Sequence, residues 1–208
     1  MSEAPSEVLT GIRSVFSVPG VYRLAQRAVG AEKFRERLVS EVLKPHERAR
    51  ILDIGCGTAD ILEVLPSVEY VGFDHSQEYV AAAKERFGSL GEFIHATTDG
   101  VDVTGLPKFD LVMSIGVLHH LDDSSVEDVL RTAAAALKPG GRFVSVDPTF
   151  AEGQHWFGKL LASRDRGQHV RSPAELRRLV EGIFGEFDVS VRHDMLTVPY
   201  SHVLVDAR

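Results

Sequence analysis

The chain has 208 residues, of which 44% are hydrophobic and 25% charged, and its formal net charge at pH 7 is −7. This composition is typical of a folded domain with a buried core, and the acidic balance argues against nucleic acid as a partner. No stretch reaches the roughly 18–20 apolar residues that span a bilayer, and the N-terminus lacks the pattern of a secretory signal, so no membrane partner is expected. The single cysteine, Cys56, excludes an intramolecular disulfide and fits a cytoplasmic protein. The sequence leaves the oligomeric state open.

Residues 1–48 are predicted to form an N-terminal helical arm. Apolar residues such as Leu24, Phe34 and Leu38 recur there at roughly helical spacing, with charged residues between them. We expect this arm to pack before the central sheet.

Strands and helices are predicted to alternate through residues 49–147. Short apolar runs indicate five strands, and several of the segments between them have the pattern of helices. This alternation is typical of a parallel sheet with helices on both faces. The predicted strands are 50–54, 70–73, 92–95, 109–114 and 142–146, and the predicted helices are 59–65, 77–87 and 126–137.

The alternation stops after Asp147. Residues 148–185 are predicted to be a helical insertion over the sheet, and its last helix starts with a capping box formed by Ser172 and Glu175. Residues 186–208 are predicted to form a closing hairpin at the sheet edge. The expected fold is therefore a single α/β domain with a Rossmann-like, open, seven-stranded sheet that is mostly parallel and has an antiparallel edge hairpin strand.

A glycine-rich turn follows the first predicted strand. The segment Leu52–Asp60 reads Leu-Asp-Ile-Gly-Cys-Gly-Thr-Ala-Asp, and its glycines let a ligand approach the backbone where a side chain would block it. Asp74 ends the second strand about 20 residues further on, where an acidic side chain accepts hydrogen bonds from ribose hydroxyls. The alternative is that Asp74 only caps the next helix. A Gly-x-Gly turn alone occurs in several nucleotide-binding families.

Three segments together are similar to one known family. Leu52–Thr58 resembles the first motif of class I S-adenosylmethionine-dependent methyltransferases, Phe109–Val112 resembles their fourth-strand motif, and Leu137–Arg142 resembles the turn before their fifth strand. The resemblance covers about residues 49–146, the predicted cofactor-binding core. It implies that the chain binds S-adenosylmethionine, transfers the methyl group to an oxygen, nitrogen or carbon of a small-molecule acceptor, and releases S-adenosylhomocysteine.

The resemblance also implies roles for individual residues. Asp53, through ordered water, and the backbone of the glycine turn would face the methionine end of the cofactor, Asp74 would bind its ribose, and the segment after the third strand would lie at the adenine. The expected cofactor-binding residues are Asp53, Gly55, Cys56, Gly57, Asp74, His75, Thr98, Asp99 and Ile115.

The chain departs from the family pattern at two positions. Thr97 stands where the family often has an acidic residue, and Asp99 follows two positions later. Ala59 replaces a glycine that is common in the family, and we expect it to be tolerated as part of a helix. Cys56 is expected to be a packed residue, because no base that could activate its thiol is evident beside it.

Two histidines follow the fourth strand, where an acceptor would lie. A hydroxyl or ammonium acceptor must lose a proton, and His120 or His119 could take it as a catalytic base. Alternatively, the histidines only shape the pocket and the reaction relies on proximity and orientation. No metal site is expected, because adjacent histidines lack the i, i+4 spacing of a helical metal site and Asp122 resembles a helix cap.

The predicted insertion gives the best indication of the acceptor's chemistry. Arginine side chains match carboxylate and phosphate oxygens, so an arginine set in this segment could hold an anionic or sugar-like acceptor. The alternative is a solvated helix end with an internal ion pair. Tyr22 in the arm could close over the same site. The expected substrate-binding residues are Tyr22, Trp156, Arg164 and Arg166, with Arg171 as a further member of the arginine set.

Two other functions share some of these features. A nicotinamide-dependent oxidoreductase would use the same glycine turn and Asp74, but its usual fingerprint has glycine where this chain has Asp60. A non-catalytic cofactor-binding module would keep the same motif without turnover. Substrates in nucleic acid or protein amides are disfavoured, because the segment after the fourth strand, Ile115–Leu118, does not resemble the proline-rich tetrapeptide of family members that act on them.

Overall fold

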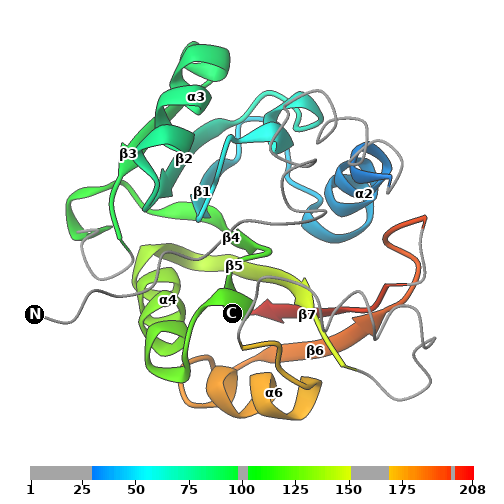
Figure 1. Cartoon of the computed structure of the whole chain (residues 1–208). Coiled ribbons are helices and arrows are strands. Elements are labelled where there is room, and N and C mark those ends of the chain that lie inside the picture. The colour runs from blue at the N-terminus through cyan, green and yellow to red at the C-terminus, as the bar shows by residue number, and fades with distance from the viewer. Residues whose placement is uncertain (1–29, 98–102, 151–168, 198–199) are drawn as a thin grey trace, which may run out of the picture.

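The computed structural model describes residues 30–97, 103–150, 169–197 and 200–208, and these form a seven-stranded sheet with helices on both faces (Figure 1). The strand order is β3-β2-β1-β4-β5-β7-β6. The strands are β1 (Arg50–Ile54), β2 (Glu69–Asp74), β3 (Gly91–His95), β4 (Phe109–Ile115), β5 (Leu137–Pro148), β6 (Phe187–Arg192) and β7 (His202–Ala207).

The sheet is parallel from β3 to β5 and ends in an antiparallel ribbon. β1 pairs with both β2 and β4, so the strand order reverses direction at β1. β7 runs antiparallel to β5 on one side and to β6 on the other. The predicted mostly parallel sheet with a closing hairpin is confirmed. Ligands of such sheets bind beyond the carboxyl ends of the strands where the order reverses, here β1 and β4.

The helices divide the core into two layers. On one face α4 (Asp123–Ala136) and α6 (Pro173–Glu181) bury Leu130 and Leu176 against the sheet. On the other face of the same sheet lie α2 (Ala31–Arg37), its π-helical continuation η2 (Leu38–Leu43) and α3 (Gln77–Phe87). Because both faces are covered, the parallel strands are apolar almost throughout.

Three helix starts follow from local capping. The Asp122 carboxylate accepts a hydrogen bond from the backbone N–H of Ser125 at 2.8 Å and starts α4 a few residues earlier than predicted. Ser76 caps α3, and Ser172 forms the predicted capping box with Glu175 at α6. Side chains of this type satisfy backbone N–H groups that have no partner inside the helix.

The predicted helix over residues 59–65 is wrong. The structure has only a short 3₁₀ helix, Asp60–Glu63, and Ala59 before it adopts a left-handed conformation with φ of 55°. Ala59 is therefore not the helical residue that we expected. Ala59 adopts a left-handed backbone conformation that a glycine would adopt more easily, because the Cβ of alanine makes this conformation less favourable.

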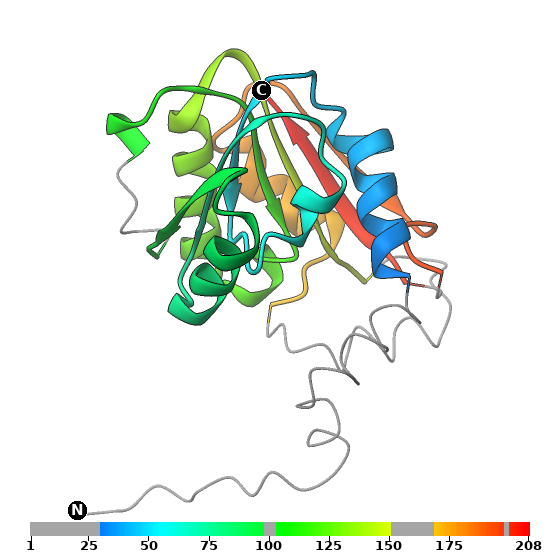
Figure 2. The same ribbon diagram turned by 90° about the horizontal axis from the view of Figure 1, so that it is seen from above.

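The described part of the N-terminal arm packs on the antiparallel ribbon. α2 lies beside β6 and β7 (Figure 2), and the rings of Phe34 and His202 are 5.3 Å apart. Arg192 on β6 forms an ion pair with Glu41 of η2 at 2.6 Å. The division of the chain into arm, core, insertion and hairpin stays a prediction. No helix of the described residues is both long enough and apolar enough to cross a bilayer.

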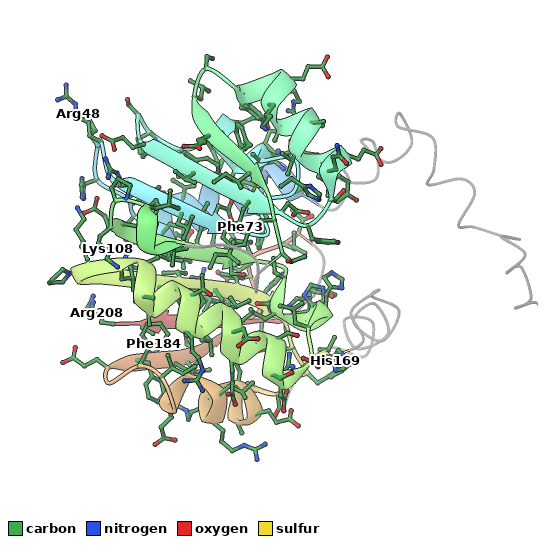
Figure 3. All side chains as sticks on the ribbon, turned by 90° about the vertical axis from the view of Figure 1, so that its left-hand side faces the viewer. Arg48, Phe73, Lys108, His169, Phe184 and Arg208 are labelled. Atoms are coloured by element: carbon green, nitrogen blue, oxygen red, sulfur yellow. The ribbon has the colours of Figure 1, made fainter. Side chains whose placement is uncertain are left out.

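The ends of the strands define two opposite edges of the sheet. Arg48 and Lys108 precede β1 and β4, Arg208 follows the antiparallel β7, and all three lie at one edge, whereas His169 lies at the opposite edge (Figure 3). That opposite edge carries the carboxyl ends of the parallel strands. The candidate site residues described below lie there.

Candidate active site

The glycine turn after β1 is attached to the end of β2 by its backbone. The N–H groups of Gly55 and Cys56 both donate to the carbonyl of Phe73, at 2.9 and 3.0 Å. The N–H of Gly57 donates to the Asp74 carboxylate at 2.9 Å. These bonds fix the turn across the carboxyl ends of two neighbouring strands.

The two glycines of the turn are needed for different reasons. Gly55 has a φ of +79°, and a Cβ there would lie 2.5 Å from a methyl group of Val117, so packing against the segment after β4 leaves no room. Gly57 has a φ of +54°, and no atom lies within 4 Å of the position of its Cβ. A ligand could therefore approach the backbone closely at Gly57 but not at Gly55.

Asp74 is buried at the end of β2 and organises the backbone around it. One of its oxygens accepts from Gly57, and the other accepts from the N–H of Ser76 at 2.8 Å. A carboxylate has about four lone-pair positions, so both oxygens keep acceptor capacity for ribose hydroxyls. The neighbouring His75 is mostly exposed, with its Nδ1 3.4 Å from the Asp74 carboxylate.

Asp53 lies near the end of β1, just before the glycine turn, and its relative exposure is 4%. It accepts a hydrogen bond from the hydroxyl of Tyr70 at 2.6 Å. Burial raises the pKa of Asp53 to about 7, against an ordinary value of 3.8. Burial also raises the pKa of the Cys56 thiol, with nearby Asp53 and Asp74 adding to the effect, so this cysteine is not an activated nucleophile.

The adenine end of the site is only partly described. Thr97, which departs from the family pattern, is exposed just after β3, and Thr98 and Asp99 lie outside the described residues. Ile115 ends β4 and is partly buried against the core layer that also contains Cys56. The adenine contacts therefore stay a prediction.

The two histidines after β4 have different surroundings. His119 is buried, and both its ring Nδ1 and its backbone N–H contact the same oxygen of Asp147, at 3.0 and 3.2 Å. His120 is exposed, and its ring lies 3.9 Å from that of His119. Asp147 is 3% exposed at the end of β5, and its other oxygen, Oδ2, has no hydrogen-bond partner among the described residues.

Arg171 holds the histidine segment in place. Its guanidinium donates to the carbonyls of Leu118, Leu121 and His169 and to the Asp123 carboxylate, at 2.7–3.2 Å. The expectation that Arg171 helps to bind an anionic acceptor is wrong, because its donors are already used within the protein. A planar guanidinium is well suited to join several carbonyls in this way.

Sequence reasoning missed two residues of this site. Asp147 directly follows the predicted strand 142–146, and the position after a strand of the parallel sheet was the signal that could have linked it to His119. Tyr70 begins the apolar run of β2 and carries no signal of its own. Four predicted residues, Tyr22, Trp156, Arg164 and Arg166, lie outside the described residues.

Comparison with known proteins agrees with this geometry. Residues 52–143 match a family model described as a methyltransferase domain. A ubiquinone biosynthesis O-methyltransferase of Bradyrhizobium diazoefficiens is 34% identical over 100 residues, which cover 46% of this chain and 38% of that protein. A trans-aconitate 2-methyltransferase of Variovorax paradoxus is 26% identical over 182 residues, covering 83% of this chain and 68% of that protein.

The fold also matches solved structures. A TehB-like methyltransferase of Corynebacterium glutamicum superposes with a TM-score of 0.66 and 18% identity, over 95% of this chain and 100% of that one. The chain spans well under half the length of the Bradyrhizobium relative, so that relative's whole activity does not transfer with the match. The family model places residues 52–143 in a methyltransferase domain family, and the relatives and the fold agree with that assignment.

Proposed function

We propose that this protein transfers a methyl group from S-adenosylmethionine to a small-molecule acceptor. The observation that carries the proposal is the convergence of Asp53, the open backbone at Gly57 and Asp74 at the carboxyl ends of β1 and β2. Both curated relatives have names of small-molecule methyltransferases, which supports an acceptor of that kind.

The residues of this edge fit the parts of the cofactor. Asp74 would accept hydrogen bonds from the ribose hydroxyls, the space over Gly57 would admit the cofactor, and Asp53 would face its methionine end. When bound, S-adenosylmethionine supplies an electrophilic methyl group on a sulfonium. The protein's contribution is to position that group and the acceptor.

His119 is the better candidate for a catalytic base. Because the Asp147 carboxylate can only accept, the His119 Nδ1 must carry a proton, and a neutral ring then has its lone pair on Nε2. The carboxylate would also stabilise the ring after it takes a proton. His120 lies on the exposed side of His119 and would contact the acceptor or shape the pocket.

The proposed acceptor is anionic or sugar-like. The Arg171 guanidinium already donates to backbone carbonyls. Binding of such an acceptor would therefore depend on Arg164 and Arg166 in the predicted insertion, with Trp156 and Tyr22 as further contacts.

Calorimetric titration with S-adenosylhomocysteine tests the cofactor half of the proposal. We expect Asp74→Asn to weaken binding about 10- to 100-fold, since hydrogen bonds to a charged group are worth roughly 1.5–3 kcal/mol. Asp128→Asn is the matched control, because Asp128 is an exposed carboxylate on α4, outside both the glycine turn and the end of β2. Wild-type protein that binds neither S-adenosylmethionine nor S-adenosylhomocysteine would overturn the proposal. A screen of anionic and sugar-like compounds for S-adenosylhomocysteine formation then separates an enzyme from a binding module.

A further inference from the structure

Tyr70 and Asp53 form a buried polar pair beneath the glycine turn. They lie on adjacent strands, β2 and β1, and the Tyr70 hydroxyl donates to Oδ2 of Asp53 at 2.6 Å. Tyr70 is 3% exposed, so its hydroxyl has lost most of its access to water. A buried hydroxyl at this distance from a carboxylate makes a strong, charge-assisted hydrogen bond.

The surrounding strands hold the Tyr70 ring in one place. A Cβ at Gly72 would lie 2.9 Å from Cε1 of the ring, and a Cβ at Gly91 would lie 2.8 Å from Cδ1. The ring of Phe93 packs against it with centroids 5.8 Å apart. Because two glycines give the ring its space, the hydroxyl position is fixed by packing and does not depend on the hydrogen bond alone.

The groups that face Asp53 include no positive charge among the described residues. They are the Tyr70 hydroxyl from β2, the Cys56 thiol from the turn and the Asp74 carboxylate from the end of β2. Burial raises the pKa of Asp53 to about 7, the Tyr70 hydrogen bond opposes this rise, and Asp74 adds to it. A cationic group bound nearby would favour the ionised carboxylate.

We propose that Tyr70 is a positioning residue for the cofactor, whose hydroxyl keeps Asp53 oriented and ionised for the α-ammonium group at the methionine end. This inference rests on the proposed function, since it requires the methionine end to lie at Asp53. Tyr70 acts through Asp53 and does not itself contact the cofactor.

Binding of S-adenosylhomocysteine measured from pH 5.5 to 7.5 tests this role. In the wild type we expect binding to tighten roughly 20-fold with rising pH, as Asp53 loses its proton. Calorimetry in buffers of different ionisation enthalpy should show a proton released on binding. Tyr70→Phe removes only the hydroxyl, and we expect it to bind about fivefold more weakly at pH 7 and to need a higher pH for tight binding.

Two controls separate this role from a structural one. 5′-Methylthioadenosine shares the adenosine and thioether of the cofactor but lacks the α-amino acid, so its binding should be insensitive to Tyr70→Phe and nearly independent of pH. Tyr79→Phe is the matched variant, because it removes a hydroxyl from an exposed tyrosine on α3. We expect it to bind both ligands like the wild type.

Each other outcome has a defined meaning. If Tyr70→Phe weakens 5′-methylthioadenosine as much as S-adenosylhomocysteine, Tyr70 only supports the fold and the inference is overturned. If the wild type binds S-adenosylhomocysteine without pH dependence and Tyr70→Phe matches it, the inference fails while the proposed function stands. If the wild type binds neither ligand, the proposed function itself fails.

Discussion

The two halves of the candidate site are built in different ways. The cofactor half uses residues 53–57 and 70–76, and most of its geometry comes from backbone N–H groups donating to Phe73 and Asp74. The acceptor half brings together His119, Asp147 and Arg171 from distant parts of the chain, and their contacts are made by buried charged or polar side chains. Two short segments that are close in the sequence can therefore specify the first half, whereas only the folded sheet assembles the second.

Substitution of the two turn glycines should break the cofactor half in two distinct ways. Gly55→Ala places a methyl group against Val117 at positive φ, and we expect a loss of about 3 kcal/mol in the free energy of unfolding. Gly57→Ala has space for its methyl group, so we expect a loss of about 1 kcal/mol from the backbone alone. Chemical denaturation measures both values.

The effect on cofactor binding should be larger for Gly57→Ala than for Gly55→Ala, the opposite of the order expected for stability. Gly57→Ala fills the space that the cofactor would occupy, so we expect S-adenosylhomocysteine to bind at least about tenfold more weakly. Adding Val117→Ala to Gly55→Ala should recover the steric part of the stability loss, which a double-mutant cycle isolates. Equal stability losses at the two glycines would show that the close contact with Val117 does not limit Gly55.

Asp147→Asn should affect the acceptor half and leave the cofactor half intact. The amide is neutral and can turn its NH₂ toward His119, which disfavours the ring form with its proton on Nδ1. We expect kcat to fall roughly 30-fold, about 2 kcal/mol, with the affinity for S-adenosylhomocysteine within about twofold of the wild type. Turnover is measured with the first acceptor that the product screen identifies.

His119→Gln and the double variant sharpen this test. If Asp147 acts through His119, the double variant should be no slower than the worse single variant. His120→Gln is the control for the neighbouring ring and should have a smaller effect on kcat. A larger loss in His120→Gln than in His119→Gln would assign the base to His120 instead.

The contrast between the halves also explains what the sequence could predict. The glycine turn, the strand before it and Asp74 form a local pattern, so their position at the sheet edge followed from spacing alone. The helix at 59–65 was predicted because a helix usually follows a glycine turn of this kind, but the backbone at Ala59 is left-handed and only a 3₁₀ segment follows it. The contacts of the turn set this left-handed conformation, and an alanine in the sequence does not indicate it.

The acceptor half was predictable in position but not in chemistry. The carboxyl end of β4 follows from the alternation of elements, so His119 and His120 could be placed near an acceptor. Which of the two is buried depends on Asp147, 28 residues later, and on Arg171, which only the strand order brings beside them. An arginine in sequence is as compatible with binding an anion as with binding carbonyls.

Two buried groups, His202 on β7 and Asp53 on β1, should also contribute opposite pH dependences to stability. Burial lowers the pKa of His202 to about 4 from an ordinary value of 6.5, with His119 adding to the effect, so on acidification the unfolded chain takes up this proton first and the folded state loses stability. Asp53 has its pKa raised to about 7 from 3.8, so the folded state takes up its proton first and gains stability over the same range. The two effects oppose each other between pH 6.5 and 4.5.

The smallest effect we expect is therefore the net change in the free energy of unfolding of the wild type. It should stay below about 1 kcal/mol over this pH range, although His202 and Asp53 each contribute about 2–3 kcal/mol. Carboxylates such as Asp194, whose pKa Arg192 holds at about 2, lose their contribution to stability only at lower pH.

His202→Phe keeps a ring against Phe34 and removes the titrating group, so acidification should stabilise this variant. Asp53→Asn should instead be destabilised by acid, and the double variant should show little change. Denaturation midpoints at the two pH values decide the matter: a His202→Phe variant with the same pH response as the wild type would mean that His202 does not oppose Asp53.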